Sequence, residues 1–126
     1  MKIIATICSR RKLEDGGLLP AYKRYTGDHI KVVYDIARKS GGHLYILSGK
    51  FGLIAADTEI PYYDYYLEDS KVEELSEIVA EQFREHGVKE VDFYTESKDS
   101  WKPYFKTLQL ASKKADVVLV VHQIDE

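Results

Sequence analysis

The sequence Lys-Ile-Ile-Ala-Thr-Ile-Cys at residues 2–8 decides the fold class of this chain of 126 residues. It is short, apolar and rich in β-branched side chains, which is typical of a strand buried on both faces. Three later segments have the same character, at residues 43–48, 90–94 and 116–122. Strands that are apolar on both faces occur almost only in parallel sheets that helices cover on both sides.

The segments between these strands have the patterns of helices. From Asp28 onward the apolar residues follow the helical spacing as far as Gly41-Gly42, where glycine accepts the left-handed turn that ends a helix. Ser70-Lys71-Val72-Glu73 is a capping-box signature for a second long helix, and a third begins near Asp99 or Ser100. A short helical turn is expected at residues 20–24.

The alternation of strands and helices predicts an α/β fold. We expect a single three-layer domain spanning residues 1–126, with a mainly parallel four-stranded sheet and helices on both faces. Right-handed crossovers leave few strand orders, and we expect 2-1-3-4.

Composition excludes several classes of protein but identifies no function. The longest aliphatic run is residues 117–121, far short of the roughly 20 residues that cross a bilayer, so we expect no membrane association. The N-terminus lacks the pattern of a signal peptide, and Cys8 is the single cysteine, so a cytoplasmic location is expected. Residues 1–50 carry ten Lys/Arg against four Asp/Glu, and residues 51–126 carry eight against seventeen. The basic half could attract an anion, although solvated helix faces give similar counts.

Candidate ligand-binding residues follow the first two strands. In open parallel sheets, ligands bind beyond the carboxyl ends of the strands. The first strand is followed by Ser9, Arg10, Arg11 and Lys12, and the second, which ends at Ser48, by Gly49, Lys50, Phe51 and Gly52. Arginine and lysine suit phosphate, and glycine allows backbone amides to approach a ligand. The alternatives are solvated basic loops and glycines that serve turn geometry alone.

Cys8, Ser48 and Asp64 are the candidate catalytic residues. Neighbouring cations would favour the Cys8 thiolate, but a cysteine that ends a buried strand also serves as a small apolar filler. The histidines have no spacing typical of metal ligands, and the full spacing of a Walker phosphate loop is missing, so we expect no metal and no cofactor.

A cluster of tyrosines lies near Asp57, Glu59 and Asp64. It comprises Tyr62, Tyr63, Tyr65 and Tyr66. Aromatic rings stack on bases, and a neighbouring carboxylate can act as a general base or hold a ribose hydroxyl. The alternative is that some of the tyrosines pack on the domain and the others lie on its surface. We expect the loop at residues 53–64 to fold back and place Asp64 in one pocket with Ser48 and Lys50.

Four motifs of the first half carry a resemblance to a known family. They are Cys8-Ser9-Arg10-Arg11-Lys12, Tyr25-Thr26-Gly27, the block Ile-Leu-Ser-Gly-Lys-Phe-Gly-Leu at residues 46–53, and Ile60-Pro61-Tyr62-Tyr63-Asp64. They resemble an uncharacterised prokaryotic and phage domain family with the motifs Cys-Ser-Lys-Lys, Tyr-Thr-Gly, Ile-Leu-Ser-Ala-Lys-Tyr-Gly-Leu and Ile-Pro-Tyr-Asp. This chain has one additional tyrosine in the last motif.

Two more distant resemblances imply an association with nucleic acid. Residues 46–67 are similar to YaaA-type peroxide-stress proteins. Cys8-Ser9 and Ser48 to Gly52 more weakly resemble the Cys-Ser-Ser-Lys and Ser-x-x-Tyr-Gly patterns in the central domain of archaeosine synthases, which modify a deazaguanine base in transfer RNA. The expected function is therefore nucleotide or nucleic-acid binding at the carboxyl edge of the sheet. Two alternatives stay open: an enzyme acting on a nucleoside, nucleobase or glycosyl bond with an Asp acid/base, and a partner-binding module without catalysis.

Overall fold

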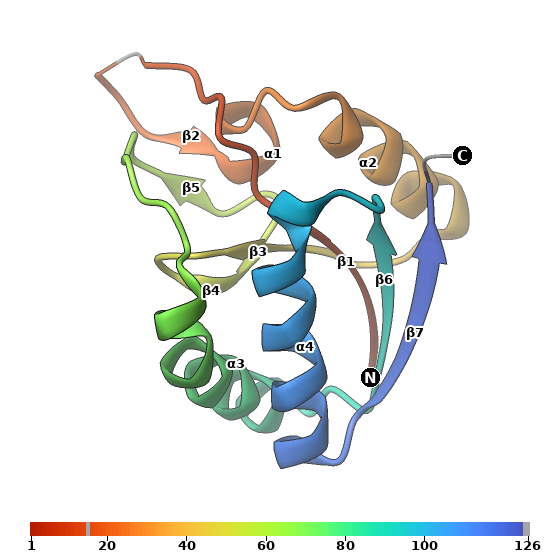
Figure 1. The fold of residues 1–126 in the computed structure, drawn as a ribbon. Helices are drawn as coiled ribbons and strands as arrows, with labels where there is room; N and C mark the ends of the chain where they lie inside the picture. The colour runs from red at the N-terminus through yellow and green to blue at the C-terminus, as the bar shows by residue number, and fades with distance from the viewer. Residues whose placement is uncertain (15, 125–126) are drawn as a thin grey trace.

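The structure, a computed structural model, describes residues 1–14 and 16–124 and is an α/β domain (Figure 1). The strands are β1 (Lys2–Ile7), β2 (Leu19–Pro20), β3 (Leu44–Ser48), β4 (Gly52–Ala55), β5 (Glu59–Ile60), β6 (Glu90–Thr95) and β7 (Val118–Gln123). The helices are α1 (Ala21–Arg24), α2 (Asp28–Ser40), α3 (Val72–His86) and α4 (Lys102–Ala115). Two short 3-10 helices, η1 (Asp69–Lys71) and η2 (Asp99–Trp101), precede α3 and α4.

The central sheet has the order β4-β3-β1-β6-β7. β1 pairs in parallel with β3 and with β6, and β6 pairs in parallel with β7. The four strands predicted from the sequence are therefore present, mutually parallel and in the predicted order 2-1-3-4. Thr6 lies opposite Ile46 and Ala5 opposite Phe93, so the carboxyl ends of the central strands meet at one edge of the sheet.

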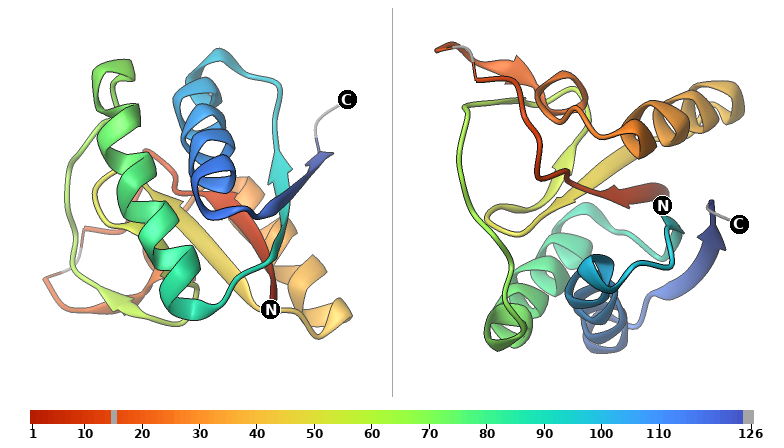
Figure 2. Two further views of the ribbon diagram at one scale, coloured as in Figure 1. Left: turned by 90° about the horizontal axis from the view of Figure 1, so that it is seen from below. Right: turned by 45° about the horizontal axis from the view of Figure 1, so that its top comes forward.

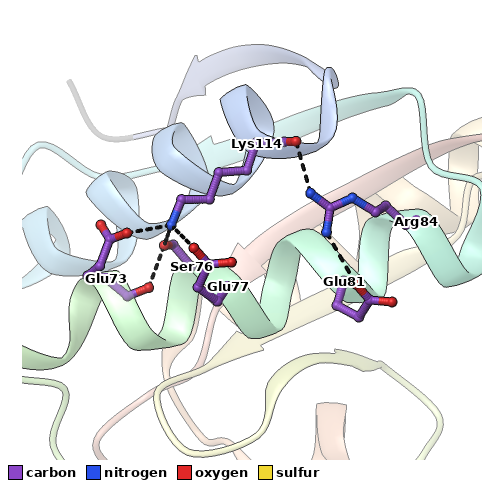
Figure 3. A network of polar contacts seen from close by, with 6 residues as sticks. All are labelled: Glu73, Ser76, Glu77, Glu81, Arg84 and Lys114. Atoms are coloured by element: carbon purple, nitrogen blue, oxygen red, sulfur yellow. Dashed lines mark hydrogen bonds and ion pairs between the residues drawn. The ribbon is translucent and has the colours of Figure 1, made fainter.

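Helices cover both faces of the sheet, as predicted. α2 lies on one side and α3 and α4 lie together on the other (Figure 2). Lys114 joins the two helices of this pair, because its Nζ lies 2.6 Å from a carboxylate oxygen of Glu73 and 2.6 Å from one of Glu77 (Figure 3). These hydrogen bonds raise the pKa of Lys114 and lower that of Glu77. Arg84 adds a bond of 3.0 Å to the carbonyl oxygen of Lys114.

One strand of the sheet was not predicted. β4 follows β3 after a tight turn and pairs with it antiparallel, with Ser48 opposite Gly52. Gly52 has φ +76°, a conformation that glycine adopts without strain. The hairpin was missed because Gly-Leu-Ile-Ala is only four residues long and directly follows another strand.

Two further predictions are wrong, one about the start of α3 and one about the exposure of β7. Ser70 does not form a capping box, because it lies inside η1, where the Lys71 N–H donates to the carbonyl of Glu68, and α3 has no side-chain cap. The last strand, β7, was expected to be apolar and covered on both faces, but Val118 is 58% exposed and Val121 45% exposed. The reason is position, since β7 is an edge strand.

Candidate functional site

A cavity of about 750 Å³ lies where the carboxyl ends of β1 and β6 meet the first turn of α2. From β1 the chain adds β3 and β4 on one side of the sheet, and it later adds β6 and β7 on the other side. The direction in which strands are added therefore reverses between β1 and β6. This is the topological switch point at which open α/β sheets bind ligands. Its lining includes Cys8, Ser9, Arg10, Arg11, Lys12, Asp28, His29, Asp64, Tyr65, Tyr66, Glu96, Lys98, Trp101 and Tyr104. We call it the switch-point cavity.

Three consecutive cations lie on the rim of the switch-point cavity. The Arg10 guanidinium lies 4.9 Å from the centroid of the Tyr66 ring, and the Lys12 ammonium lies 4.7 Å from that of the Tyr63 ring. Within residues 1–14 and 16–124, neither Arg10, Arg11 nor Lys12 forms an ion pair with a carboxylate. Within the described residues their positive charges therefore have no ion-pair partner and are available to an anion.

The segment of residues 9–12, which we call the basic loop, is held by polar contacts with the segment before α2. Ser9 is 8% exposed, its Oγ donates to the carbonyl of Arg11 at 2.6 Å, and it accepts the N–H of Gly27 at 3.2 Å. Ser9, a predicted ligand-binding residue, thus lines the cavity but has both contacts inside the protein. Lys12 forms a β-bridge with Tyr25, which keeps the loop against the domain.

Arg24 is a buried residue whose guanidinium hydrogen-bonds the segment that follows this loop. Its side chain is 0% exposed and donates to the carbonyl of Leu13 at 2.7 Å, to that of Ile60 at 3.1 Å and to that of Gly17. It therefore ties the basic loop to β5, which pairs with β2 in a two-stranded ribbon. No pattern in the sequence distinguishes this buried arginine from the exposed Arg10 and Arg11.

Ser48 is an internal anchor of the turn between β3 and β4. It is 0% exposed, and its Oγ accepts the N–H groups of Lys50 and Phe51, each at 3.1 Å. Both acceptor sites of the hydroxyl are then occupied, so its proton goes to the Tyr63 hydroxyl 2.8 Å away. The Tyr63 hydroxyl in turn contacts that of Tyr25 at 2.5 Å. Burial raises the pKa of Tyr63 to about 12, so the hydroxyl keeps its proton at neutral pH.

This geometry decides between two interpretations of Gly49 and Gly52. The segment from Gly49 to Gly52 forms the hairpin turn, and its amides at Lys50 and Phe51 point at Ser48. A Cβ at Gly49 would lie 3.1 Å from that of Leu67, and one at Gly52 would lie 2.6 Å from the Gln82 side chain. Turn geometry and close packing therefore explain both glycines.

Cys8 lies at the inner end of the switch-point cavity. Its Sγ is 3.6 Å from the Tyr104 hydroxyl, which also lines the cavity. Burial raises the pKa of the thiol, and the hydrogen bond between Cys8 and Tyr104 opposes that shift without reversing it. The thiol is therefore protonated at neutral pH, which favours the interpretation of Cys8 as an apolar filler over that of an activated nucleophile.

Asp64 does not share a pocket with Ser48 and Lys50, contrary to the prediction. Asp64 lines the switch-point cavity, whereas Lys50 lines a separate pocket of about 120 Å³ against α3. Tyr65 lines both, because the segment that follows Pro61 passes between them. No ion pair joins Asp64 to a cation of the described part of the chain. Asp64 therefore lines the same cavity as the basic loop, whereas Lys50 does not line that cavity.

The tyrosine cluster divides between core and surface. Tyr63 is 6% exposed and packs edge-on against Phe51, with ring centroids 5.1 Å apart. Tyr62 is exposed and lies outside the switch-point cavity, whereas Tyr65 and Tyr66 are exposed and line it. The aromatic wall of the cavity is thus made by the later pair, which was not among the predicted ligand-binding residues.

Two further cavity residues were missed. His29 packs edge-on against Trp101, with ring centroids 4.8 Å apart. Its Nε2 lies 2.8 Å from the Ile7 carbonyl, which only accepts, so Nε2 carries the proton and Nδ1 has the lone pair. Burial lowers the pKa of His29, so the ring is neutral at pH 7. The position of His29 at the start of α2 was the available signal, since helix N-termini border switch-point sites.

A second cavity, of about 760 Å³, lies between α1 and α2. Its walls include the stacked rings of Tyr22 and Tyr34, and Asp57 lines a smaller neighbouring pocket. Neither is lined by Cys8, Arg10 or Asp64. Across the described residues, no three His, Cys, Asp or Glu side chains are grouped as a metal site would require, and no helix is long and apolar enough to span a bilayer.

Comparison with protein families adds one finding. Residues 3–124 match the model of a family described as Family of unknown function (DUF6884). The chain belongs to this family. A search of curated proteins and a search of solved structures each found no match. The family covers both the basic loop and the segment of tyrosines, so the switch-point cavity lies wholly within the DUF6884 domain.

Proposed function

We propose that this DUF6884 domain binds the phosphate and base of a nucleotide or a nucleic-acid segment in the switch-point cavity. The observation that carries the proposal is the set of three adjacent cations, Arg10, Arg11 and Lys12, without carboxylate partners among the described residues, at the rim of that cavity. Unpaired arginines beside a cavity suit phosphate, because the guanidinium offers a planar fork of donors that matches phosphate oxygens.

The remaining lining supports a nucleotide over a simple anion. Tyr65 and Tyr66 are exposed aromatic side chains of the kind on which bases stack, and Arg10 already lies over the Tyr66 ring. Asp28 adds a carboxylate, which can accept hydrogen bonds from ribose hydroxyls and base amino groups. The first turn of α2 adds the partial positive charge of a helix N-terminus.

Lys50 and Phe51 suggest how a polymer would extend beyond the cavity. They lie on the other side of Tyr65, where the Lys50 ammonium is 5.4 Å from the centroid of the Phe51 ring. A strand of nucleic acid that crosses Tyr65 would reach this second cation. The resemblance of residues 46–67 to YaaA-type proteins, and of the Cys-Ser motif to archaeosine synthases, supports nucleic acid by analogy.

An enzyme that acts on a nucleoside or nucleobase is the second candidate. It is favoured by one observation, namely that Cys8, His29 and Asp64 line the same cavity. In this version His29, neutral with its lone pair on Nδ1, and the Asp64 carboxylate are both bases, and the one that takes a proton from the substrate would return it as the acid to the leaving group. The protonated thiol of Cys8 would contribute to substrate fit.

The test is binding of a short fluorescent single-stranded oligonucleotide, followed by anisotropy over a range of salt concentrations. Each phosphate contact contributes about 0.7 to the slope of log affinity against log salt, so replacing Arg10, Arg11 and Lys12 by alanine should lower that slope by up to about 2. The matched control replaces Lys89, Lys106 and Lys113, three exposed lysines elsewhere, and so removes the same charge. Equal losses in both triple variants would reduce the effect to net charge and overturn the proposal.

A further inference from the structure

The outer edge of β7 is an exposed apolar strand. The sequence Val-Leu-Val-Val-His-Gln of β7 contains no Lys, Arg, Asp or Glu. Val118, Val120 and Val121 are 58%, 36% and 45% exposed. Edge strands of monomeric proteins are normally protected by charges, prolines, bulges or a covering element, because an open edge pairs with other strands.

The opposite edge of the same sheet is protected. On β4, the Gln82 side-chain amide accepts the Leu53 N–H at 2.8 Å and donates to the Leu53 carbonyl at 3.1 Å. The side chain from α3 thus occupies the backbone groups that a further strand would need. No such side chain contacts the outer backbone groups of Leu119 or Val121 among the described residues.

The backbone of β7 shows which groups face outward. Val118 donates to the Lys89 carbonyl and Ile124 donates to the Thr95 carbonyl, so the even-numbered residues bond to β6. Since successive residues of a strand bond to opposite sides, the N–H and C=O groups of Leu119 and Val121 point away from the sheet. These are the four backbone groups that a neighbouring strand would pair with.

We propose that a second copy of this chain pairs with this edge, β7 against β7, antiparallel and about a two-fold axis that passes at Val120. In this register Leu119 faces Val121 of the second copy, and the two pairs exchange four N–H to O=C bonds. Val118 faces His122 of the second copy, and Val120 faces itself. The result is one continuous sheet through both copies.

The occupant is a second copy because the edge is complementary to itself. A two-fold axis perpendicular to the sheet keeps each face on its own side, so Val120 meets Val120 and Leu119 meets Val121 without a polar mismatch. Since the strand has no charged side chain, two copies meet without repulsion of like charges. Pairing of β7 with β7 also uses the open edge of both copies, so that no β7 edge remains for a third copy of the chain.

Cysteine cross-linking tests the register. Directly opposed residues of a non-hydrogen-bonded antiparallel pair have Cα atoms about 4.5 Å apart, within the range of a disulfide. Val120→Cys should therefore form a covalent dimer readily on mild oxidation. Val118→Cys is the matched control, because it is on the same face and more exposed, but in this register its copies are about 13 Å apart along the strands. The wild-type chain, whose single Cys8 is buried, should form none.

Sedimentation equilibrium tests the association itself. The wild-type mass should rise with concentration from 14.5 kDa toward twice that value. Val120→Lys places like charges opposite each other and should stay monomeric, whereas Ile78→Lys, at a 44% exposed position on α3, should dimerise like the wild type. A wild-type chain that stays monomeric at the highest soluble concentration would overturn the proposal. So would equal cross-linking of the two cysteine variants, since it would mean a different interface or random collision.

Discussion

Replacing Ser48 by alanine should destabilise the domain strongly, although the change removes a single oxygen. The Oγ of Ser48 makes three hydrogen bonds, to the N–H groups of Lys50 and Phe51 and to the hydroxyl of Tyr63. Each such bond contributes about 1 kcal/mol net, and buried partners that lose it keep their desolvation cost, so we expect a loss of about 3 kcal/mol. For a domain of this length that corresponds to a fall of about 10 °C in Tm.

The assay is urea unfolding followed by circular dichroism, with Ser112→Ala as the matched control. Ser112 is also buried, on α4, but its hydroxyl has no hydrogen-bond partner within the described residues. Its removal should leave the stability unchanged or slightly higher. A double-mutant cycle with Tyr63→Phe isolates the bond between the two side chains, for which we expect a coupling of about 1 kcal/mol.

The result that would refute this reasoning is a Ser48→Ala variant as stable as the Ser112→Ala variant. The hydrogen bonds of Ser48 would then contribute nothing to folding, and the prediction that Ser48 is a catalytic residue would be favoured again. The expected loss instead assigns Ser48 to the turn that supports Lys50 and Phe51.

Three further substitutions and one measurement of thiol reactivity have definite expected outcomes. Arg24→Met should cost about 3 kcal/mol in urea unfolding, because the buried carbonyl of Ile60 and the part-buried carbonyls of Leu13 and Gly17 lose their donor; a loss below about 1 kcal/mol would contradict a structural role for these hydrogen bonds. Burial holds the pKa of His29 below its usual range, so the unfolded chain takes up a proton first as the pH falls through about 6.5; the wild type should lose stability there relative to His29→Gln, and parallel pH profiles would count against this. Because burial raises the pKa of Cys8, its reaction with a disulfide reagent at neutral pH should be at least about tenfold slower than that of free cysteine, and a faster reaction would indicate an activated thiolate. Asp64→Asn should leave oligonucleotide affinity equal or higher if the domain only binds, so a large loss of affinity would assign the carboxylate a direct contact with the ligand.

The strand order and the two-sided helix layers could be predicted because they depend on local patterns. The β-branched run at residues 2–8 favours a strand, and the glycines at residues 41–42 favour the end of a helix, in each case through local conformational preferences. The right-handedness of crossovers then limits the possible strand orders. β4 could not be predicted in this way, because a four-residue strand after a tight turn has no period of its own. The exposure of β7 follows from its place at the edge, which the predicted order 2-1-3-4 already implied, although the apolar residues 118–123 taken alone are typical of a strand covered on both faces.

The candidate site was predicted in part for the same reason. Arg10, Arg11 and Lys12 follow a predicted strand directly, so their edge of the sheet was known once the sheet was parallel. The side on which Asp64 lies depends on how the segment after Pro61 crosses that edge, and a sequence without helical or strand periodicity does not fix such a path. The loop passes so that Asp64 joins the cavity of the basic loop and Lys50 does not.

The fluorescence of Trp101 offers the most direct measurement of the central claim, that a nucleotide binds in the switch-point cavity. Trp101 is the single tryptophan of the chain and lines that cavity, so its emission reports on this site alone when it is excited selectively. We expect titration with a nucleotide of low absorbance at the exciting wavelength to change the emission saturably, with an affinity that falls with salt and with replacement of Arg10, Arg11 and Lys12 by alanine. The Lys89, Lys106 and Lys113 triple variant should titrate like the wild type. An emission that stays constant at nucleotide concentrations that saturate the protein in an independent binding assay would place the ligand elsewhere and contradict the account.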